Sequence, residues 1–146
     1  MRGVVKAFKV LSDETRLRVL NLLLERECCV CEVMQALEIS QSRASRGLAA
    51  LYDAGFLKLK KEGLWSLYSI DCEGVKSYQS QLIKAVKEAL KNNPVAALDK
   101  ERLKKARRVG VGCLRGLCVP ARPAAGKSKM NGKHGDRRRI PLRPGQ

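Results

Sequence analysis

The stretch that decides the fold is ECCVCEVMQALEISQSRASRGLAAL, residues 27–51. Three cysteines lie near its N-terminal end: Cys28, Cys29 and Cys31. After them, apolar residues recur at the spacing of one helical face, a short break follows at Glu38-Ile39-Ser40, and a second apolar face begins. The pattern predicts two short helices joined by a tight corner.

The second of these helices carries side chains of a kind that can read DNA. Ser40 is a suitable N-cap, and Ala44, Leu48 and Leu51 share one apolar face. We expect the remaining polar residues to project elsewhere: Gln41, Ser42, Arg43, Ser45 and Arg46. Glutamine can pair with adenine and arginine with guanine, so the set suits a recognition helix in the major groove. An ordinary surface helix would carry the same residue types.

The net charge of +16 over 146 residues is concentrated at the C-terminal end of the chain. Residues 1–100 contribute +4 and residues 101–146 contribute +12. A basic chain favours nucleic acid through counterion release, although that attraction is independent of base sequence. Residues 120–146 are rich in Pro, Gly, Lys and Arg, and we expect them to form a disordered basic tail.

Cysteine usage points to metal or redox chemistry. The apolar runs fall short of the roughly 20 residues of a membrane span, so we expect no membrane partner and a cytoplasmic protein. Six cysteines in that compartment are reduced rather than bridged, and close spacing then favours a thiolate site.

The single histidine, His134, lies in the tail, and no catalytic triad or phosphate-binding glycine loop is present, so no enzyme is predicted.

The flanking segments predict a mainly α fold with a β-hairpin wing. Helices are expected at 2–10 and 14–25, with Arg16 and Arg18 as solvated surface. Alternating residues then indicate strands at 56–60 and 64–70. A hairpin directly after a recognition helix is the arrangement of a winged helix-turn-helix. The basic residues of this hairpin can reach phosphates or the minor groove, or simply protect a sheet edge: Lys58, Lys60 and Lys61.

A helical pattern returns at 73–91, and its apolar stripe predicts a dimer interface. The stripe consists of Val75, Tyr78, Leu82, Val86 and Leu90. Burial against residues 2–10 within one subunit is the alternative, but a two-fold protein matches a palindromic DNA site. We therefore divide the chain into a DNA-binding and dimerisation domain at 1–92, an extension with a short helix and a Cys pair at 93–119, and the tail at 120–146.

Three successive segments resemble the ArsR/SmtB-type winged-helix repressors. They are LSDETRLRVLNLLLERE, CCVCEVMQALEISQSRASRGLAALYDAGFL and KKEGLWSLYSI, within residues 4–91. The arsenic-responsive branch has a Cys-Val-Cys signature, here at residues 29–31, followed by an acidic residue, here Glu32. The resemblance implies a homodimer that represses its own resistance operon and leaves operator DNA when As(III) or Sb(III) binds. Met34 replaces a third cysteine of that branch, and Gly47 replaces a histidine of its recognition helix.

The resemblance places the metalloid on three thiolates, of which Cys29 and Cys31 are the first two. On a continuous helix these two lie about 200° apart, so we expect the helix start to fray or unwind on binding. Cys28 is the preferred third ligand, ahead of Cys113 or Cys118. A helix N-terminus should lower the thiol pKa. The remaining thiol of the six is expected to be buried and structural; it is Cys72.

The alternative hypotheses keep the same fold but assign a different ion or chemical signal to the protein. A cadmium or lead sensor could use four thiolates, with Cys113 and Cys118 completing the set. A redox switch would form a disulfide among residues 28–31. A zinc sensor is disfavoured, because residues 73–91 offer only Glu73 and Glu88 as ligands. An RNA-binding or ribosomal role would use the basic tail, but would leave the thiol cluster unexplained.

Overall fold

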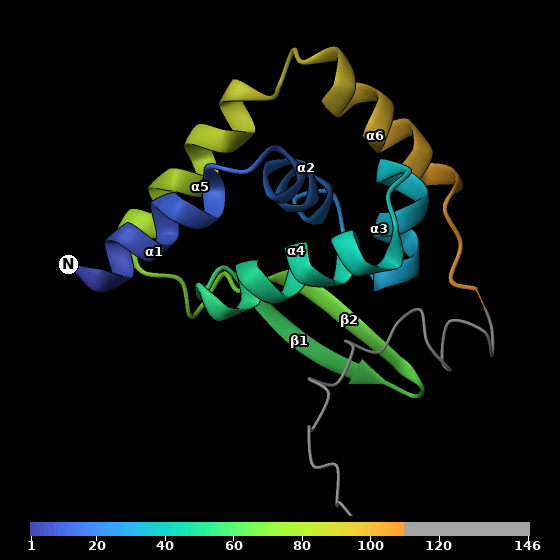
Figure 1. The fold of residues 1–146 in the computed structure, drawn as a ribbon, viewed down its shortest axis with the longest axis horizontal. Helices are drawn as coiled ribbons and strands as arrows, with labels where there is room; N and C mark the ends of the chain where they lie inside the picture. Colours follow the sequence, from blue (N-terminus) through green and yellow to red (C-terminus); the bar gives the residue numbers. More distant parts are fainter. Residues whose placement is uncertain (110–146) are drawn as a thin grey trace, which may run out of the picture.

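A computed structural model describes residues 1–109, which contain six helices and one antiparallel hairpin (Figure 1). The elements in chain order are α1 (Arg2–Leu11), α2 (Glu14–Leu23), α3 (Val30–Leu37), α4 (Gln41–Asp53), β1 (Leu57–Glu62), β2 (Trp65–Ile70), α5 (Ser77–Ala89) and α6 (Pro94–Lys105). The predicted mainly α fold with a β-hairpin wing is confirmed. None of the helices in this part of the chain is long and apolar enough to span a membrane.

The corner between α3 and α4 forms as the sequence predicts. Glu38 ends α3 in the left-handed conformation, with φ of 52°. Ser40 then caps α4, because its hydroxyl accepts a hydrogen bond from the backbone N–H of Arg43 at 3.3 Å. Asp13 caps α2 in the same way through the N–H of Arg16, at 2.9 Å. These caps fix where α2 and α4 begin.

Helix α2 lies at the centre of the molecule, and the other helices and the hairpin surround it (Figure 1). Val19, Leu20 and Leu22 of α2 are fully buried. Leu48 of α4 and Phe56, just before β1, are fully buried as well. Because aromatic residues make up only 4% of the chain, leucine, valine and alanine supply most of this packing.

The hairpin extends beyond the helical core as a wing (Figure 1). Its register runs from Leu57 opposite Ile70 to Glu62 opposite Trp65, and Gly63 makes the turn with φ of 59°. Beyond Leu57 every residue of β1 is exposed. The wing therefore presents a polar strand to solvent while β2 faces the core.

Helix α5 begins later than predicted, at Ser77 rather than near residue 73. Asp71 accepts a hydrogen bond from the N–H of Gly74 at 3.0 Å, which stabilises a turn before the helix. Val75 therefore lies outside the helix, and its predicted place in the helical stripe is wrong. Cys72 lies in the same turn and is exposed, so the prediction of a buried structural thiol is also wrong.

Helix α6 packs on α2 and α3 and buries Ala96, Asp99 and Leu103. Asp99 is only 1% exposed, and the guanidinium of Arg18 donates two hydrogen bonds to it, both at 2.8 Å. Arg18 is therefore an inter-helix partner, and its prediction as solvated surface is wrong. Because Leu103 joins the main core, α6 shares the hydrophobic core of the preceding elements.

We expect Asp99→Ala to lower the free energy of unfolding by about 3 kcal/mol, because it leaves the half-buried guanidinium of Arg18 without its partner. Urea denaturation measures the change. Glu101→Ala, on the solvent side of α6, is the matched control and should leave the unfolding midpoint unchanged. Equal midpoints for both variants would show that the Arg18–Asp99 pair does not hold α6 in place.

Candidate functional site

The sulfur atoms of Cys29 and Cys31 lie 2.7 Å apart in the interior of the protein. Cys29 is the N-cap of α3, with extended backbone angles of φ −88° and ψ 169°, and the helix begins at Val30. Because Cys29 precedes the helix, the angular separation expected on a continuous helix does not apply. The prediction that the helix must unwind to bring these sulfurs together is wrong.

Cys28 points away from this pair. Its N–H and C=O bond to the C=O and N–H of Tyr68 at 3.0 and 2.9 Å, which adds one residue to the edge of β2. Successive side chains of an extended segment point to opposite sides. Accordingly Cys28 joins the main core, whereas Cys29 and Cys31 form a separate cluster with Leu67 and Trp65. This geometry does not favour Cys28 as the third ligand.

Glu32 holds the thiol segment in position from inside the protein. It is 3% exposed, and its Oε2 accepts the N–H of Cys29 at 2.8 Å. Its Oε1 accepts from Arg26 at 2.8 Å, and Arg108 lies 3.6 Å from Oε2. Sequence reasoning noted only that Glu32 is acidic. A glutamate three residues after an N-cap is the spacing of a capping box, and that signal would have predicted the contact.

Burial raises the pKa of the Cys28 thiol to about 12. Burial also raises the pKa of Cys29, and the contact with the Cys31 sulfur adds to the shift. The prediction that a helix N-terminus lowers these pKa values is wrong, because desolvation of a thiolate outweighs the helix dipole here. Cys28 and Cys29 are therefore protonated at neutral pH. A thiol at either position must lose its proton to bind a metal or metalloid as a thiolate.

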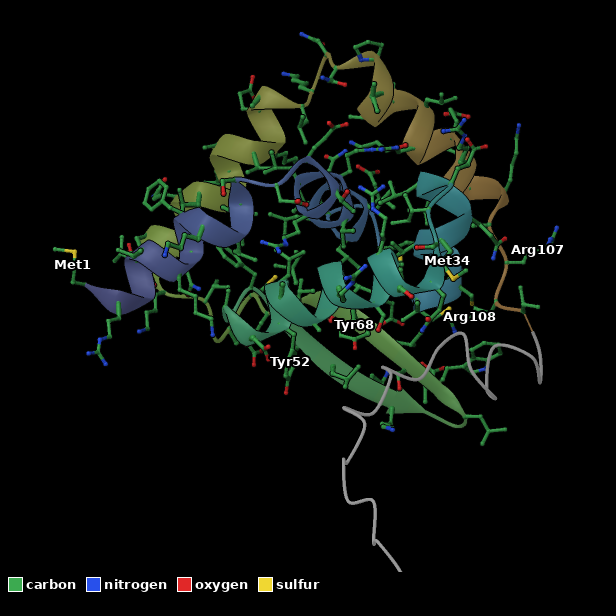
Figure 2. The ribbon with its side chains drawn as sticks, viewed as in Figure 1. Met1, Met34, Tyr52, Tyr68, Arg107 and Arg108 are labelled. Carbon is green, nitrogen blue, oxygen red and sulfur yellow. The ribbon has the colours of Figure 1, made fainter. Side chains whose placement is uncertain are left out.

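The chain leaving α6 runs beside α3 (Figure 2). Gln35 and Arg107 exchange two hydrogen bonds, at 2.7 and 3.1 Å, and Arg108 reaches Glu32. Three or more His, Cys, Asp or Glu residues do not gather in metal-binding geometry within 1–109. Two predicted ligands lie outside the described residues, Cys113 and Cys118.

Helix α4 presents most of its predicted DNA-facing side chains to solvent. Ser42, Arg43 and Arg46 are exposed, and Gln41 is half-buried. Ser45 is only 8% exposed, so the prediction that it projects away from the apolar face is wrong. The physical reason is angular: Ser45 lies about 60° from Leu48 around the helix axis, and its small side chain is covered by the same neighbours.

The wing and α4 are neighbours (Figure 1). Both carry exposed basic residues. Lys58, Lys60 and Lys61 are all exposed on β1, where Lys60 lies 3.7 Å from Glu62. The two elements that sequence analysis assigned to DNA are thus brought together. Their role in binding remains a prediction.

Three of the five predicted dimer residues line an apolar groove of about 400 Å³ between α1 and α5: Leu82, Val86 and Leu90. Residues of α1 and α5 line the two sides of this groove, so the alternative of packing within one subunit is partly realised. That packing leaves Phe8 58% exposed and Leu82, Val86 and Leu90 half-buried. Tyr78 is half-buried on the same helix, with its hydroxyl towards Gly3 of α1.

A winged helix-turn-helix with basic residues on α4 and on the wing is an arrangement typical of DNA-binding domains. Residues 13–64 match the bacterial regulatory proteins of the arsR family, and the chain belongs to this family. It is 46% identical over 74 residues to the cadmium resistance transcriptional regulatory protein CadC homolog of Staphylococcus aureus. That alignment covers 50% of this chain and 61% of the relative.

Two further relatives extend the comparison. The arsenical resistance operon repressor of Bacillus subtilis is 33% identical over 82 residues, covering 56% of this chain and 78% of the relative. The solved structure of reduced HlyU from Vibrio cholerae superposes with a TM-score of 0.52 and 28% identity, covering 60% of this chain and 88% of that one. The chain spans 57–64% of the length of several curated relatives that it matches.

We expect alkylation by iodoacetamide to separate the cysteines of the described region. Cys72 is exposed and should react fast, whereas Cys28, Cys29 and Cys31 are buried and should react slowly. Peptide mass spectrometry at neutral pH follows each residue. Urea-unfolded protein is the control, and there all four should react at similar rates. Fast labelling of Cys29 in the folded protein would contradict its burial and its raised pKa.

Proposed function

We propose that this chain is a metalloid-responsive repressor that binds operator DNA as a homodimer and releases it when As(III) or Sb(III) binds. The observation that carries the proposal is the Cys29–Cys31 pair, with sulfur atoms 2.7 Å apart between α3 and β2. Soft thiolates suit thiophilic ions, and related proteins are named for arsenic and for cadmium resistance.

The pair fits one ion after a small side-chain movement. Two thiolates at about 2.3 Å from a tetrahedral zinc ion lie about 3.8 Å apart, which serves as a guide for other soft ions. The sulfur atoms of Cys29 and Cys31 therefore need to separate by about 1 Å. Rotation of the two side chains supplies that movement without unwinding α3.

The third thiolate comes from Cys113 or Cys118 in this proposal, instead of Cys28. Arg108 is 3.6 Å from Glu32, which itself holds Cys29 in place. Five residues of extended chain span up to about 17 Å, so Cys113 is within reach of the pair in the same subunit. In this reading residues 93–119 are a ligand-bearing extension of the 1–92 domain. Use of both distal thiols would give the four-thiolate set of a cadmium or lead sensor.

Operator recognition is assigned to α4 and the wing. Gln41, Ser42, Arg43 and Arg46 enter the major groove in this proposal, because they are the accessible polar residues of α4. The wing lysines contact phosphates or the minor groove. Ser45 is left out of this set because of its burial.

Release follows from the position of the sulfur pair beside the wing. Leu67 and Trp65 of the hairpin pack against Cys29 and Cys31, and the preceding Cys28 is hydrogen-bonded to β2. Opening the pair therefore displaces β2 relative to α3 and α4. Converting 99% DNA-competent protein to 1% requires a preference of about 5.5 kcal/mol for the released form. Operator DNA must weaken metalloid binding by the same factor.

A thiol-redox switch is the second candidate function. Two sulfur atoms at 2.7 Å are close to the 2.05 Å of a disulfide, so oxidation needs only a small approach of the pair. This alternative uses the same two cysteines and no third ligand. Release of DNA by peroxide, with no effect of arsenite, would favour it over metalloid sensing.

We expect Cys29→Ser and Cys31→Ser to bind a fragment of the chain's own promoter like the wild type and to lose release by arsenite. Serine retains N-cap character at position 29, so the fold should persist. Mobility-shift assays measure both properties. Cys28→Ser and Cys72→Ser are matched controls and should still respond. Full response in the first two variants would remove the proposed sensor.

We expect Val86→Arg to yield monomers with weakened promoter binding, because a charge in the apolar α1–α5 groove opposes its burial against a second subunit. Sedimentation equilibrium measures the mass. Leu98→Arg adds the same charge on the exposed face of α6 and should leave the mass unchanged. A dimeric Val86→Arg variant would place the interface elsewhere.

A further inference from the structure

A polar hollow lies between the start of α2 and the solvent face of α4. It measures about 200 Å³ and is lined by Asp13, Thr15, Arg16, Arg43, Arg46 and Gly47. We propose that this hollow binds one phosphodiester group of the DNA backbone, with Arg16 as its principal ligand. The inference deepens the proposed operator binding and rests on it.

The charge of the hollow favours an anion. Three guanidinium groups, those of Arg16, Arg43 and Arg46, face one carboxylate, that of Asp13. The ion pairs within residues 1–109 involve none of the three arginines. Asp13 is partly engaged, since its Oδ1 accepts the backbone N–H of Arg16. A phosphate here would neutralise an excess of positive charge.

Hydrogen bonds within the hollow hold its donors in place before any ligand arrives. Arg43 donates to Thr15 Oγ1 at 2.9 Å, so the hydroxyl proton of Thr15 remains to be donated elsewhere. Arg46 donates from Nε to the C=O of Ser42 at 3.2 Å, which leaves its terminal nitrogens for a ligand. The positive end of the α2 dipole adds to these fixed donors.

The hollow is small and polar, as a site for a phosphate group would be. Sites for drug-sized ligands measure about 300–1,000 Å³ and are mostly apolar, whereas this one is smaller and lined by charged groups. The planar fork of arginine pairs with two phosphate oxygens at once. A single phosphate group is therefore the ligand that these residues suit.

The position of the hollow beside α4 indicates that DNA supplies the phosphate. Arg43 and Arg46 belong to the helix proposed to enter the major groove, and a groove is bordered by two phosphate backbones. Arg16 lies beside this helix on a separate element, so it would contact the border and not the bases. Such contacts fix the register of a protein on DNA without reading its sequence. Sequence analysis had assigned Arg16 to solvated surface only.

The test measures affinity for the promoter fragment over a range of salt concentrations. We expect Arg16→Ala to weaken binding about tenfold and to reduce the slope of log K against log salt by about 1. Arg16→Lys keeps the charge and should retain most of the slope. Lys105→Ala removes one positive charge from α6 and should change neither quantity. Thermal melting confirms that all three variants are folded.

A second arm locates the phosphate. Methylphosphonate linkages, which lack the charge, are placed one at a time along the fragment. We expect one linkage in each half-site to weaken the wild type and to leave Arg16→Ala unaffected. Absence of any such linkage, or a slope change no larger than that of Lys105→Ala, overturns the inference.

A third arm uses inorganic phosphate and DNA-free protein. Saturable binding that Arg16→Ala abolishes, together with unaltered promoter affinity, would identify a free-anion site and overturn the DNA assignment. Failure of the wild-type chain to bind the promoter fragment at any salt concentration would overturn the proposed function itself.

Discussion

The proposed sensor depends on the hydrogen bond between the buried carboxylate of Glu32 and the backbone of Cys29. The carboxylate accepts the N–H of Cys29 and so keeps that residue as the N-cap of α3, where its sulfur meets the sulfur of Cys31. Arg26 compensates the buried charge and also donates to the C=O of Leu103 at 3.1 Å. Glu32 and Arg26 together thus link the thiol pair, the segment after α2 and the end of α6.

The same junction continues into the wing through the backbone. The paired hydrogen bonds between Cys28 and Tyr68 attach the thiol segment to β2, and two hydrophobic side chains of the hairpin cover the sulfur atoms. At the other end of α4, Gln79 of α5 donates to the C=O of Ala54 at 2.8 Å. The helix assigned to DNA is therefore held between the sensor junction and the helix assigned to dimerisation.

The helices, the strands and their order could be predicted from the sequence, because periodicity, capping residues and turn residues all agreed. The geometry of the site could not be predicted, because it depends on single-residue details. Because α3 starts at Val30, Cys29 lies outside the helix, and its sulfur meets that of Cys31 instead of lying on the opposite side of a helix. Ser45 was misjudged because burial at the margin of an apolar face depends on neighbouring helices. The Arg18–Asp99 contact and the Glu32–Arg108 contact each join residues that are distant in sequence, and no local pattern identifies them.

The central claim is that ion capture by Cys29 and Cys31 loosens the junction between the thiol segment and β2. Amide hydrogen exchange at Cys28 and Tyr68, with and without antimonite, tests it most directly. The account predicts that protection at both amides falls as antimonite binds, over the same concentration range in which promoter DNA is released. Unchanged protection at both amides while DNA is released would contradict it.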